Sequence, residues 1–170
     1  MDSSALEFLL RFNIWANRRL LDAIESLSGN ADLTPIRDMV AHIVAAEWIW
    51  MERLEGVSPG EVPAWVDAEG LEPLRERLAV VETRRAAFLE TLDESGTRRV
   101  VEFRLLNGSS GTAEVWQLMV HVINHSTYHR GQLARLLREA GVTPPTTDLI
   151  SFCPEGGQYR SRESRRSDCE

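Results

Sequence analysis

The sequence predicts an all-α protein built as a four-helix bundle, with a long crossover and a small β-hairpin-like excursion before the last helix. Three observations support this fold class. Apolar residues recur every three or four positions in four long segments. Residues typical of helix starts and stops bound these segments. A connection rich in proline and glycine, at positions 58–63, is long enough to cross one end of a bundle.

The first helix is expected over residues 4–27. Asp2, Ser3 or Ser4 can serve as its N-cap, because short polar side chains accept hydrogen bonds from the free N–H groups of a first turn. Gly29 marks the stop. Its apolar face comprises Leu6, Leu9, Leu10, Leu20, Leu21, Ile24 and Leu27. This face predicts a helix that packs against a core along its whole length.

The second helix is expected from Thr34 to a stop at Gly56. Thr34 is interpreted as the capping residue, and Pro35 suits the first helical position because its missing N–H has no partner there in any case. Its apolar face comprises Ile36, Met39, Ile43, Ala46, Trp50 and Leu54. The third helix begins near Leu71, and its apolar positions are Leu71, Leu74, Leu78, Val81, Phe88 and Leu92.

A short β-like stretch separates the third helix from the fourth. Val101, Phe103 and Leu105 alternate with polar residues and lead into Asn107–Gly108, a dipeptide typical of tight hairpin turns. The fourth helix is expected over residues 113–140. Thr112 is its expected cap, Gly141 its stop, and the prolines at 144 and 145 follow the end.

The chain reads as one bundle domain over residues 1–153 and a polar tail over 154–170, which we expect to be disordered. The net charge is −7 and all nineteen cationic residues are arginine. An acidic chain without a basic stripe argues against nucleic-acid binding. No apolar run reaches the ~18 residues of a membrane span, and no signal peptide is evident. We therefore expect a cytoplasmic protein without a membrane partner.

The four histidines fall on or beside the apolar faces of two predicted helices. His121, His125 and His129 are spaced by four residues, so they lie within an arc of roughly 80° on the last helix. His129 is central on the apolar face, whereas His121 lies at its edge. His42 flanks the apolar face of the second helix. Facing helices of a bundle can thus bring His42, His125 and His129 to one divalent metal ion.

Two alternatives to a metal site remain open. Buried histidines are commonly hydrogen-bonded core residues, and a bundle can also hold haem between histidines of facing helices. We favour a metal because one cation satisfies three imidazoles at once. Three protein ligands also leave a coordination position open for water or substrate, as in catalytic zinc sites.

Several segments resemble one family. The segment HVINHSTYHRGQLARLLREAG at 121–141 resembles the closing helix of the DinB (damage-inducible, YfiT-like) family of metal-dependent enzymes, and TPPTTDLISF at 143–152 continues in the same style. AHIVAAEWIWMERLEG at 41–56 and FNIWANRRLLDAI at 12–24 are similar to earlier parts of that family. The likeness covers about residues 5–152, and NHSTYHRGQ is its most specific piece.

The resemblance implies an up-down-down-up bundle, frequently dimeric, with His42, His125 and His129 as ligands of zinc or nickel. Known relatives include low-molecular-weight-thiol S-transferases and a thiol-dependent maleylpyruvate isomerase. We therefore expect a homodimer that acts on a small-molecule substrate, either as a hydrolase or as a thiol S-transferase with a low-molecular-weight thiol cosubstrate. The alternative is a non-catalytic, stress-related metal- or ligand-binding module. No catalytic residue can be assigned from the sequence.

Polar residues near the histidines are candidates for a supporting role. Asn13 and Asn17 lie within the apolar stripe of the first helix, where one or both orient a ligand histidine or line the pocket, or else bridge helices in the core. Glu47 is either a proton acceptor near the metal or an ion-paired or solvated carboxylate. Gln132, Tyr128 and His121 lie along one edge of the fourth helix. Gln132 either binds a metal-bound water or caps the polar edge.

Overall fold

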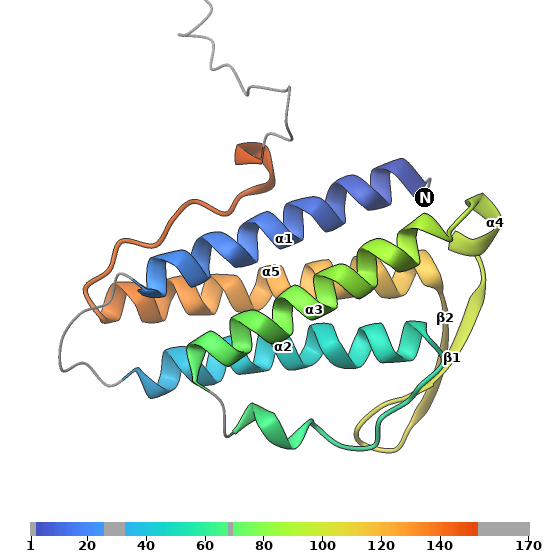
Figure 1. Ribbon diagram of the computed structural model, residues 1–170, viewed down its shortest axis with the longest axis horizontal. Coiled ribbons are helices and arrows are strands. Elements are labelled where there is room, and N and C mark those ends of the chain that lie inside the picture. The colour runs from blue at the N-terminus through green and yellow to red at the C-terminus, as the bar shows by residue number, and fades with distance from the viewer. Residues whose placement is uncertain (1–2, 26–32, 68–69, 153–170) are drawn as a thin grey trace, which may run out of the picture.

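Four long helices form a bundle in the computed structural model, which describes residues 3–25, 33–67 and 70–152 (Figure 1). The elements in chain order are α1 (Ser3–Glu25), α2 (Thr34–Leu54), the short 3₁₀ helix η1 (Ala64–Val66), α3 (Leu71–Glu90), α4 (Glu94–Thr97), β1 (Val100–Arg104), β2 (Ser110–Glu114), α5 (Val115–Glu139) and the 3₁₀ helix η2 (Leu149–Ser151). The predicted all-α class is confirmed, as is the small hairpin before the last helix.

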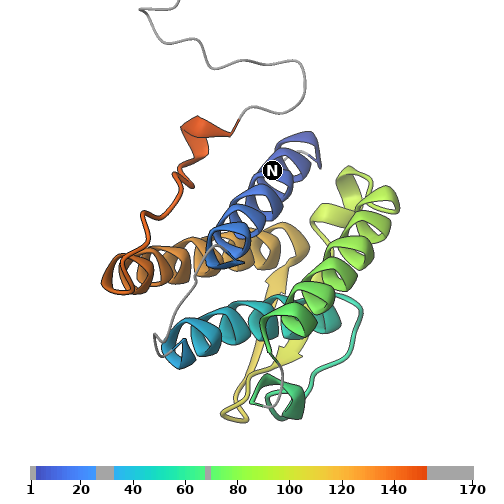
Figure 2. The ribbon, with the colours of Figure 1, turned by 60° about the vertical axis from the view of Figure 1, so that its left-hand side comes forward.

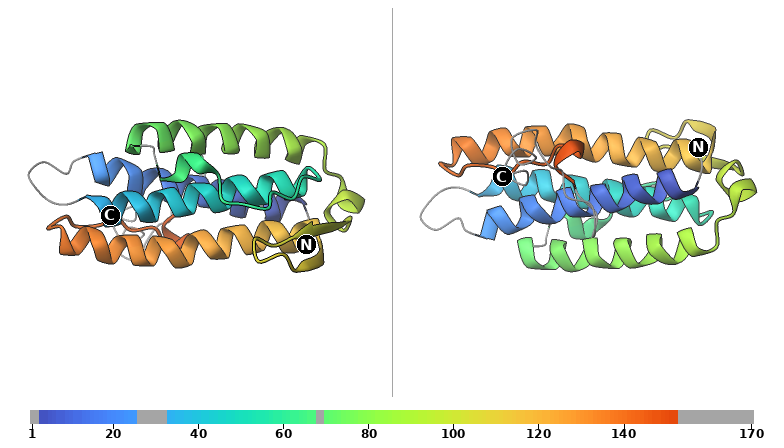
Figure 3. Two further views of the ribbon diagram at one scale, coloured as in Figure 1. Left: turned by 90° about the horizontal axis from the view of Figure 1, so that it is seen from below. Right: turned by 90° about the horizontal axis from the view of Figure 1, so that it is seen from above.

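The four long helices run up, down, down and up. In Figure 1, α2 and α3 point the same way because the crossover that carries η1 returns along the length of the bundle. α1 and α5 point the opposite way. Figure 3 shows α3 and α5 at opposite edges, with α1 and α2 between them on opposite faces. α2 therefore packs against both α5 and α3, and α1 packs mainly against α5.

The predicted stop glycines at 56 and 141 end their helices in the same way. Gly56 and Gly141 adopt φ values of +90° and +82°, which favour glycine because a Cβ would clash. In each case the next residue donates its N–H back into the last turn, Val57 to Glu52 O and Val142 to Leu137 O, both at 2.8 Å. This pairing is the Schellman motif, and it satisfies carbonyls that the helix end would leave free.

The predicted N-caps of α2 and α5 are wrong. Leu33 occupies the cap position of α2 and makes no side-chain capping bond, so Thr34 is already helical. Glu114 caps α5 in place of Thr112: its side chain accepts from the backbone of Gln117, whose own side chain accepts from Glu114 N at 2.9 Å. Thr112 does not cap α5 because it lies in β2, where it pairs with Glu102 of β1. Of the proposed caps of α1, Asp2 lies outside the described residues, and Ser3 and Ser4 are already helical. Gly29 and the tail at 154–170 also lie outside the described residues.

The predicted hairpin is an antiparallel pair in which Val101 lies opposite Ala113 and Phe103 opposite Gly111. Leu105 N donates to Ser109 O at 2.8 Å, and the Asn107 side chain accepts from Ser109 N at 3.0 Å, so the turn falls at Asn107–Gly108 as expected. Figure 2 shows the hairpin and η1 on one side of the bundle beside α2. The hairpin and η1 therefore cover part of the surface of α2. The short helix α4, which precedes the hairpin, was not predicted.

The apolar core consists of two clusters, one toward each end of the bundle. One gathers residues such as Leu10, Met51 and Met119 beside the hairpin. The other gathers residues such as Leu20, Val44 and Leu133 at the opposite end. Buried polar side chains lie between the two clusters along α1, α2 and α5. None of the described helices is long and apolar enough to cross a membrane.

Candidate metal centre

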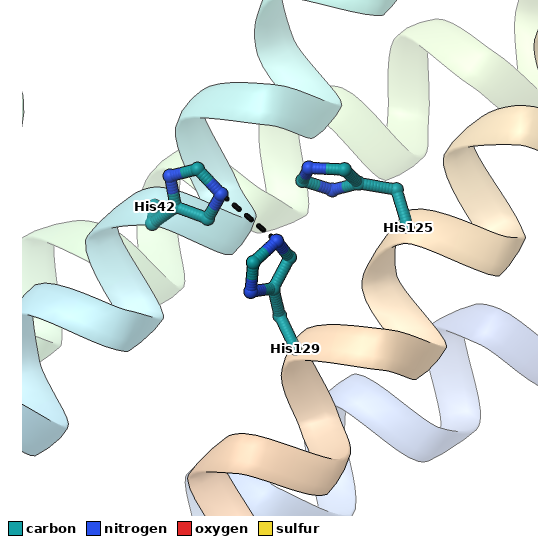
Figure 4. Close-up of side chains that lie close together, drawn as sticks. All are labelled: His42, His125 and His129. Atoms are coloured by element: carbon teal, nitrogen blue, oxygen red, sulfur yellow. Dashed lines mark hydrogen bonds between the residues drawn. The ribbon is translucent and has the colours of Figure 1, made fainter.

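His42 on α2 meets His125 and His129 on α5, where the two helices pack side by side (Figure 4). One ring nitrogen from each histidine lies within 4.8 Å of the other two. His42 is exposed at the helix surface, whereas His125 and His129 are half-buried. The structure thus brings together the three histidines that the sequence singled out, in an arrangement that could hold one metal ion.

The spacing between the rings suits a shared ion. His42 Nε2 lies 3.1 Å from His129 Nε2. Two imidazole nitrogens on one tetrahedral zinc, each at about 2.0–2.1 Å, lie about 3.3–3.4 Å apart. The ring of His125 is close to both, with centroid separations of 4.4 Å to His129 and 5.3 Å to His42. The separation of the His42 and His129 nitrogens is therefore close to that of two ligands of one zinc ion, and the third ring lies beside them.

Gln132 and Tyr128 both contact the ring of His129. Gln132 Oε1 lies 2.8 Å from His129 Nδ1, so this amide oxygen can accept the proton of Nδ1 and leave the lone pair of Nε2 free. Tyr128, which is 65% exposed, packs the edge of its ring against His129 at a centroid distance of 5.0 Å. Of the edge candidates, Gln132 is the one that orients a histidine of the cluster.

Burial and crowding keep two of these imidazoles neutral. Burial lowers the pKa of His125 to about 4, assisted by the nearby His129, His42 and His121. Burial also lowers the pKa of His42, with a smaller contribution from His129. Metal ions bind neutral imidazole, so a proton must not compete for the nitrogen. These two side chains are therefore in their metal-binding form at neutral pH.

His121 is not part of the three-histidine group. Its ring lies 5.9 Å from that of His125 but packs more closely on Trp50, at 4.7 Å. Burial lowers the pKa of His121, and the charge of Arg53 lowers it further. His121 is thus a neighbour of the cluster, facing the end of α2 where Arg53 lies.

A cavity of about 420 Å³ opens beside the histidines. Helix α2 forms one wall, and the crossover, the hairpin turn and α5 contribute the rest. The lining residues are Asp38, Ala41, His42, Ala45, Ala46, Ile49, Trp50, Arg53, Val62, Val66, Asp67, Leu106 and His125. This volume lies in the range typical of small-molecule sites, so a ligand can approach the histidines from the cavity.

Asn13, Asn17 and Glu47 form a polar layer inside the bundle, and their hydrogen bonds do not reach the imidazoles. Glu47 is fully buried, and its Oε1 accepts from Asn13 Nδ2 at 2.6 Å, Asn17 Nδ2 at 3.1 Å and Ser126 Oγ at 2.7 Å. Its Oε2 accepts from Arg85. The asparagines therefore bridge helices in the core, and Glu47 is the ion-paired carboxylate of the two alternatives rather than a proton acceptor beside a metal.

Glu47 remains charged within this layer. Burial opposes its charge, but the Arg85 cation and the hydrogen bonds from Arg85, Ser126 and Asn13 outweigh burial and hold the pKa of Glu47 below its ordinary value. Arg130 supplies a second cation, donating from Nη1 to Asn13 Oδ1 at 2.6 Å and to Asn17 Oδ1 at 2.8 Å. Burial lowers the pKa of Arg130 to about 10, so it stays protonated at neutral pH.

Sequence reasoning missed the roles of Arg130 and Ser126. Each lies one residue after a histidine of the cluster, so each projects about 100° around α5 from that histidine and is buried in the bundle. Ser126 and Arg130 are four residues apart, as are Asn13 and Asn17, and this matching spacing of polar residues on two apolar faces was the available signal. Arg85, which is 4% exposed, is the ion partner of Glu47.

Comparison with known proteins identifies the family of the chain. The DinB family model matches residues 1–158. Protein DinB of Bacillus subtilis (strain 168) is 24% identical over 156 residues, which cover 82% of this chain and 88% of that protein. The match spans all four long helices, including the segments that carry His42, His125 and His129. The chain belongs to the DinB family.

Proposed function

We propose that this protein is an enzyme with one divalent metal ion on His42, His125 and His129, and that it transfers a low-molecular-weight thiol to a small electrophile. The convergence of three ring nitrogens within 4.8 Å, beside a 420 Å³ cavity that His42 and His125 line, carries this proposal. Three histidines leave a metal with an open coordination position. Zinc or nickel bound there would act as a Lewis acid that lowers the pKa of a thiol or of water.

The surroundings of the histidines favour thiol transfer over hydrolysis. A hydrolase needs a general base within hydrogen-bond reach of the attacking water. Glu47 is not available for this role, because both its oxygens accept hydrogen bonds inside the bundle. Asp38 lines the cavity but pairs with Arg37. A thiol that has lost its proton to solvent needs no general base. Thiol transfer therefore does not require a free carboxylate beside the histidines.

The reaction would substitute one group on the electrophile. The thiol loses its proton to solvent, and the thiolate sulfur attacks the electrophilic carbon. A carbon–sulfur bond forms as the bond to the leaving group breaks, and the leaving group departs with that electron pair. His125 and His129 would hold the metal ion beside the reacting atoms, and Gln132 would keep His129 in the tautomer that leaves Nε2 free.

Metal analysis of protein purified without an affinity tag tests the centre. About one equivalent of zinc or nickel should be present in the wild type and lost in both His125→Ala and His129→Ala. His121→Ala is the matched control, since it removes a histidine from the same helix outside the three-histidine group. A wild type that is metal-free and takes up neither zinc nor nickel would overturn the proposal.

The reaction class is tested on metal-replete protein. A chlorodinitrobenzene electrophile is offered with and without a panel of low-molecular-weight thiols, and both chloride release and conjugate formation are followed. Thiol-dependent turnover lost in His125→Ala supports transfer. Turnover of ester or amide substrates without thiol would establish hydrolysis instead. A full metal complement with no turnover of either kind would favour the non-catalytic metal- or ligand-binding module.

A further inference from the structure

Arg53 is a buried cation on the wall of the cavity that His42 and His125 also line. Its side chain is 3% exposed, and its Nε and Nη2 atoms have no hydrogen-bond partner in the described part of the chain. A guanidinium carries five N–H donors and accepts nothing, so buried donors of this kind call for an acceptor. The buried Arg85 and Arg130 also leave one nitrogen each without a partner, but another nitrogen of each donates to an acceptor within the bundle.

Aromatic packing accounts for the faces of the Arg53 guanidinium but not for its edges. Its Cζ lies 4.4 Å from the centroid of the Trp50 ring and 6.0 Å from that of Phe103. Stacking of this kind fixes a planar guanidinium while its N–H groups remain directed outward in the plane. A carboxylate or a phosphate can accept two parallel hydrogen bonds from that edge. The stacked rings therefore hold Arg53 in a position suited to an oxyanion.

The acidic residues of the cavity wall do not neutralise Arg53. Asp38 lies fifteen residues earlier on α2, a helix rise of about 22 Å, and pairs with Arg37. The main-chain oxygen of Asp67 accepts from the same arginine, at 3.0 Å, which places Asp67 at the Asp38 end of the cavity. Burial lowers the pKa of Arg53, and no carboxylate opposes this effect. Asp38 and Asp67 thus lie at one end of the cavity and Arg53 at the other, with the histidines between them.

We propose that Arg53 forms an oxyanion subsite, and that the small molecule bound in this cavity carries a carboxylate or phosphate group there while its reacting end meets the histidines. The second half of this inference rests on the proposed function. A line of aromatic rings runs from the histidines toward Arg53. The ring of His121 lies between those of His125, at 5.9 Å, and Trp50, at 4.7 Å. Ile49, Val62 and Leu106 supply apolar wall elsewhere in the cavity. The expected substrate is therefore an anionic small molecule whose central part is apolar.

Isothermal titration calorimetry on the full chain tests the subsite. Glutarate and inorganic phosphate are titrated into zinc-loaded and metal-free protein, with glutaramide as the neutral control. We expect at least one anion to bind the metal-free wild type and Arg53→Met to weaken that binding at least tenfold. Arg53→Lys, which keeps the charge without the planar fork, should fall between them. The two anions distinguish a carboxylate site from a phosphate site.

Arg77→Met is the matched control, because Arg77 also lies over a tryptophan, 5.0 Å from the Trp65 centroid, but does not line the cavity. It should bind anions as the wild type does. Equal binding by wild type and a folded Arg53→Met, or no binding of either anion by the wild type, would overturn the proposal. Metal content is measured in parallel. Arg53-dependent anion binding without metal uptake would overturn the metal centre alone, and metal uptake without anion binding would overturn the subsite alone.

A second measurement on the wild type covers the case in which Arg53→Met does not fold. Phenylglyoxal modifies arginine side chains, and mass spectrometry of the digested protein reports each site. Glutarate or phosphate should slow the modification of Arg53 and leave that of Arg77 unchanged. Modification of Arg53 at the same rate with and without saturating anion would count against the subsite.

Discussion

Nδ1 of His129 lies 2.8 Å from Oε1 of Gln132, less than one turn further along α5. The amide oxygen can only accept, so the pairing assigns the imidazole proton to Nδ1 and directs the free lone pair of Nε2 toward the cluster. The sequence suggested a role for Gln132 with a metal-bound water or at the polar edge of the helix. The structure shows a contact with the ring itself.

Replacing Gln132 tests this contact. Gln132→Leu removes the acceptor and should weaken zinc affinity about 10–100-fold, since loss of a partner that orients a ligand histidine typically has that effect. Gln132→Glu keeps an acceptor at the same position and should retain most of the affinity. Competition titration against a chromophoric chelator measures both. Equal affinity for Gln132→Leu and wild type would show that His129 needs no such orientation.

Glu47 should be critical for stability rather than for chemistry. Glu47→Gln leaves the buried Arg85 without its ion partner and weakens the acceptor of three further hydrogen bonds. Breaking a buried ion pair on one side typically costs about 3–5 kcal/mol. Urea unfolding followed by circular dichroism measures the free energy of unfolding. Glu139→Gln, which breaks an exposed pair with Arg135, is the control and should change it by less than about 0.5 kcal/mol.

Ser126→Ala isolates the hydrogen bond that joins α5 to Glu47. Its hydroxyl is fully buried and donates at 2.7 Å to a charged carboxylate, so its loss should cost about 1.5–3 kcal/mol of unfolding free energy. Thr83→Ala removes an exposed hydroxyl that bonds only within its own helix, and it should change stability by about 0.5 kcal/mol or less. Similar values for the two variants would contradict a role for Ser126 in linking the helices.

Zinc affinity should be only weakly sensitive to pH near neutrality. Protons and metal compete for the same nitrogens, so affinity falls as pH falls. Burial lowers the pKa of His42 and lowers that of His125 to about 4, and proton competition at these residues therefore begins below the ordinary histidine value. The loss between pH 7 and pH 6 should be smaller than the about thirtyfold that three histidines at pKa 6.5 would give. Chelator competition at each pH measures this loss.

We expect the protein to form a homodimer. Trp48 and Trp116 lie off the main apolar faces of α2 and α5 and remain only partly buried. Large amphipathic rings in such positions are enriched at protein interfaces. Light scattering at micromolar concentration should give about twice the chain mass of 19.2 kDa. A mass of one chain at that concentration would contradict the expectation.

The positions of the helices and the histidine cluster could be predicted because both follow from local periodicity. Residues four apart on an amphipathic helix share a face in almost any environment, so His125 and His129 had to project together. Glycine stops at 56 and 141 were equally local. The N-caps are not set locally in this way. Several polar residues precede α5, and the strand pairing of Thr112 leaves another of them, Glu114, to act as its cap.

The partners of the buried charges could not be predicted in the same way. Glu47 lies on the border of an apolar face, and such a position fits either a cavity wall or a core. The choice depends on Arg85 and Arg130, which are 38 and 83 residues away in sequence and reach the same point only after the helices pack. Arginine on an apolar face usually extends its charge to water. Here enough acceptors converge to keep both cations inside.

The polar layer around Glu47 has a consequence for how the bundle aligns along its axis. Apolar side chains tolerate sliding of one helix past another, because leucine can replace leucine against the same surface. A shift of α5 by one turn, about 5.4 Å, would carry Ser126 and Arg130 away from the oxygens that they contact and leave charges buried without partners. That penalty disfavours slipped packings. The same alignment sets His42 level with His125 and His129, so the fold itself brings the three histidines together.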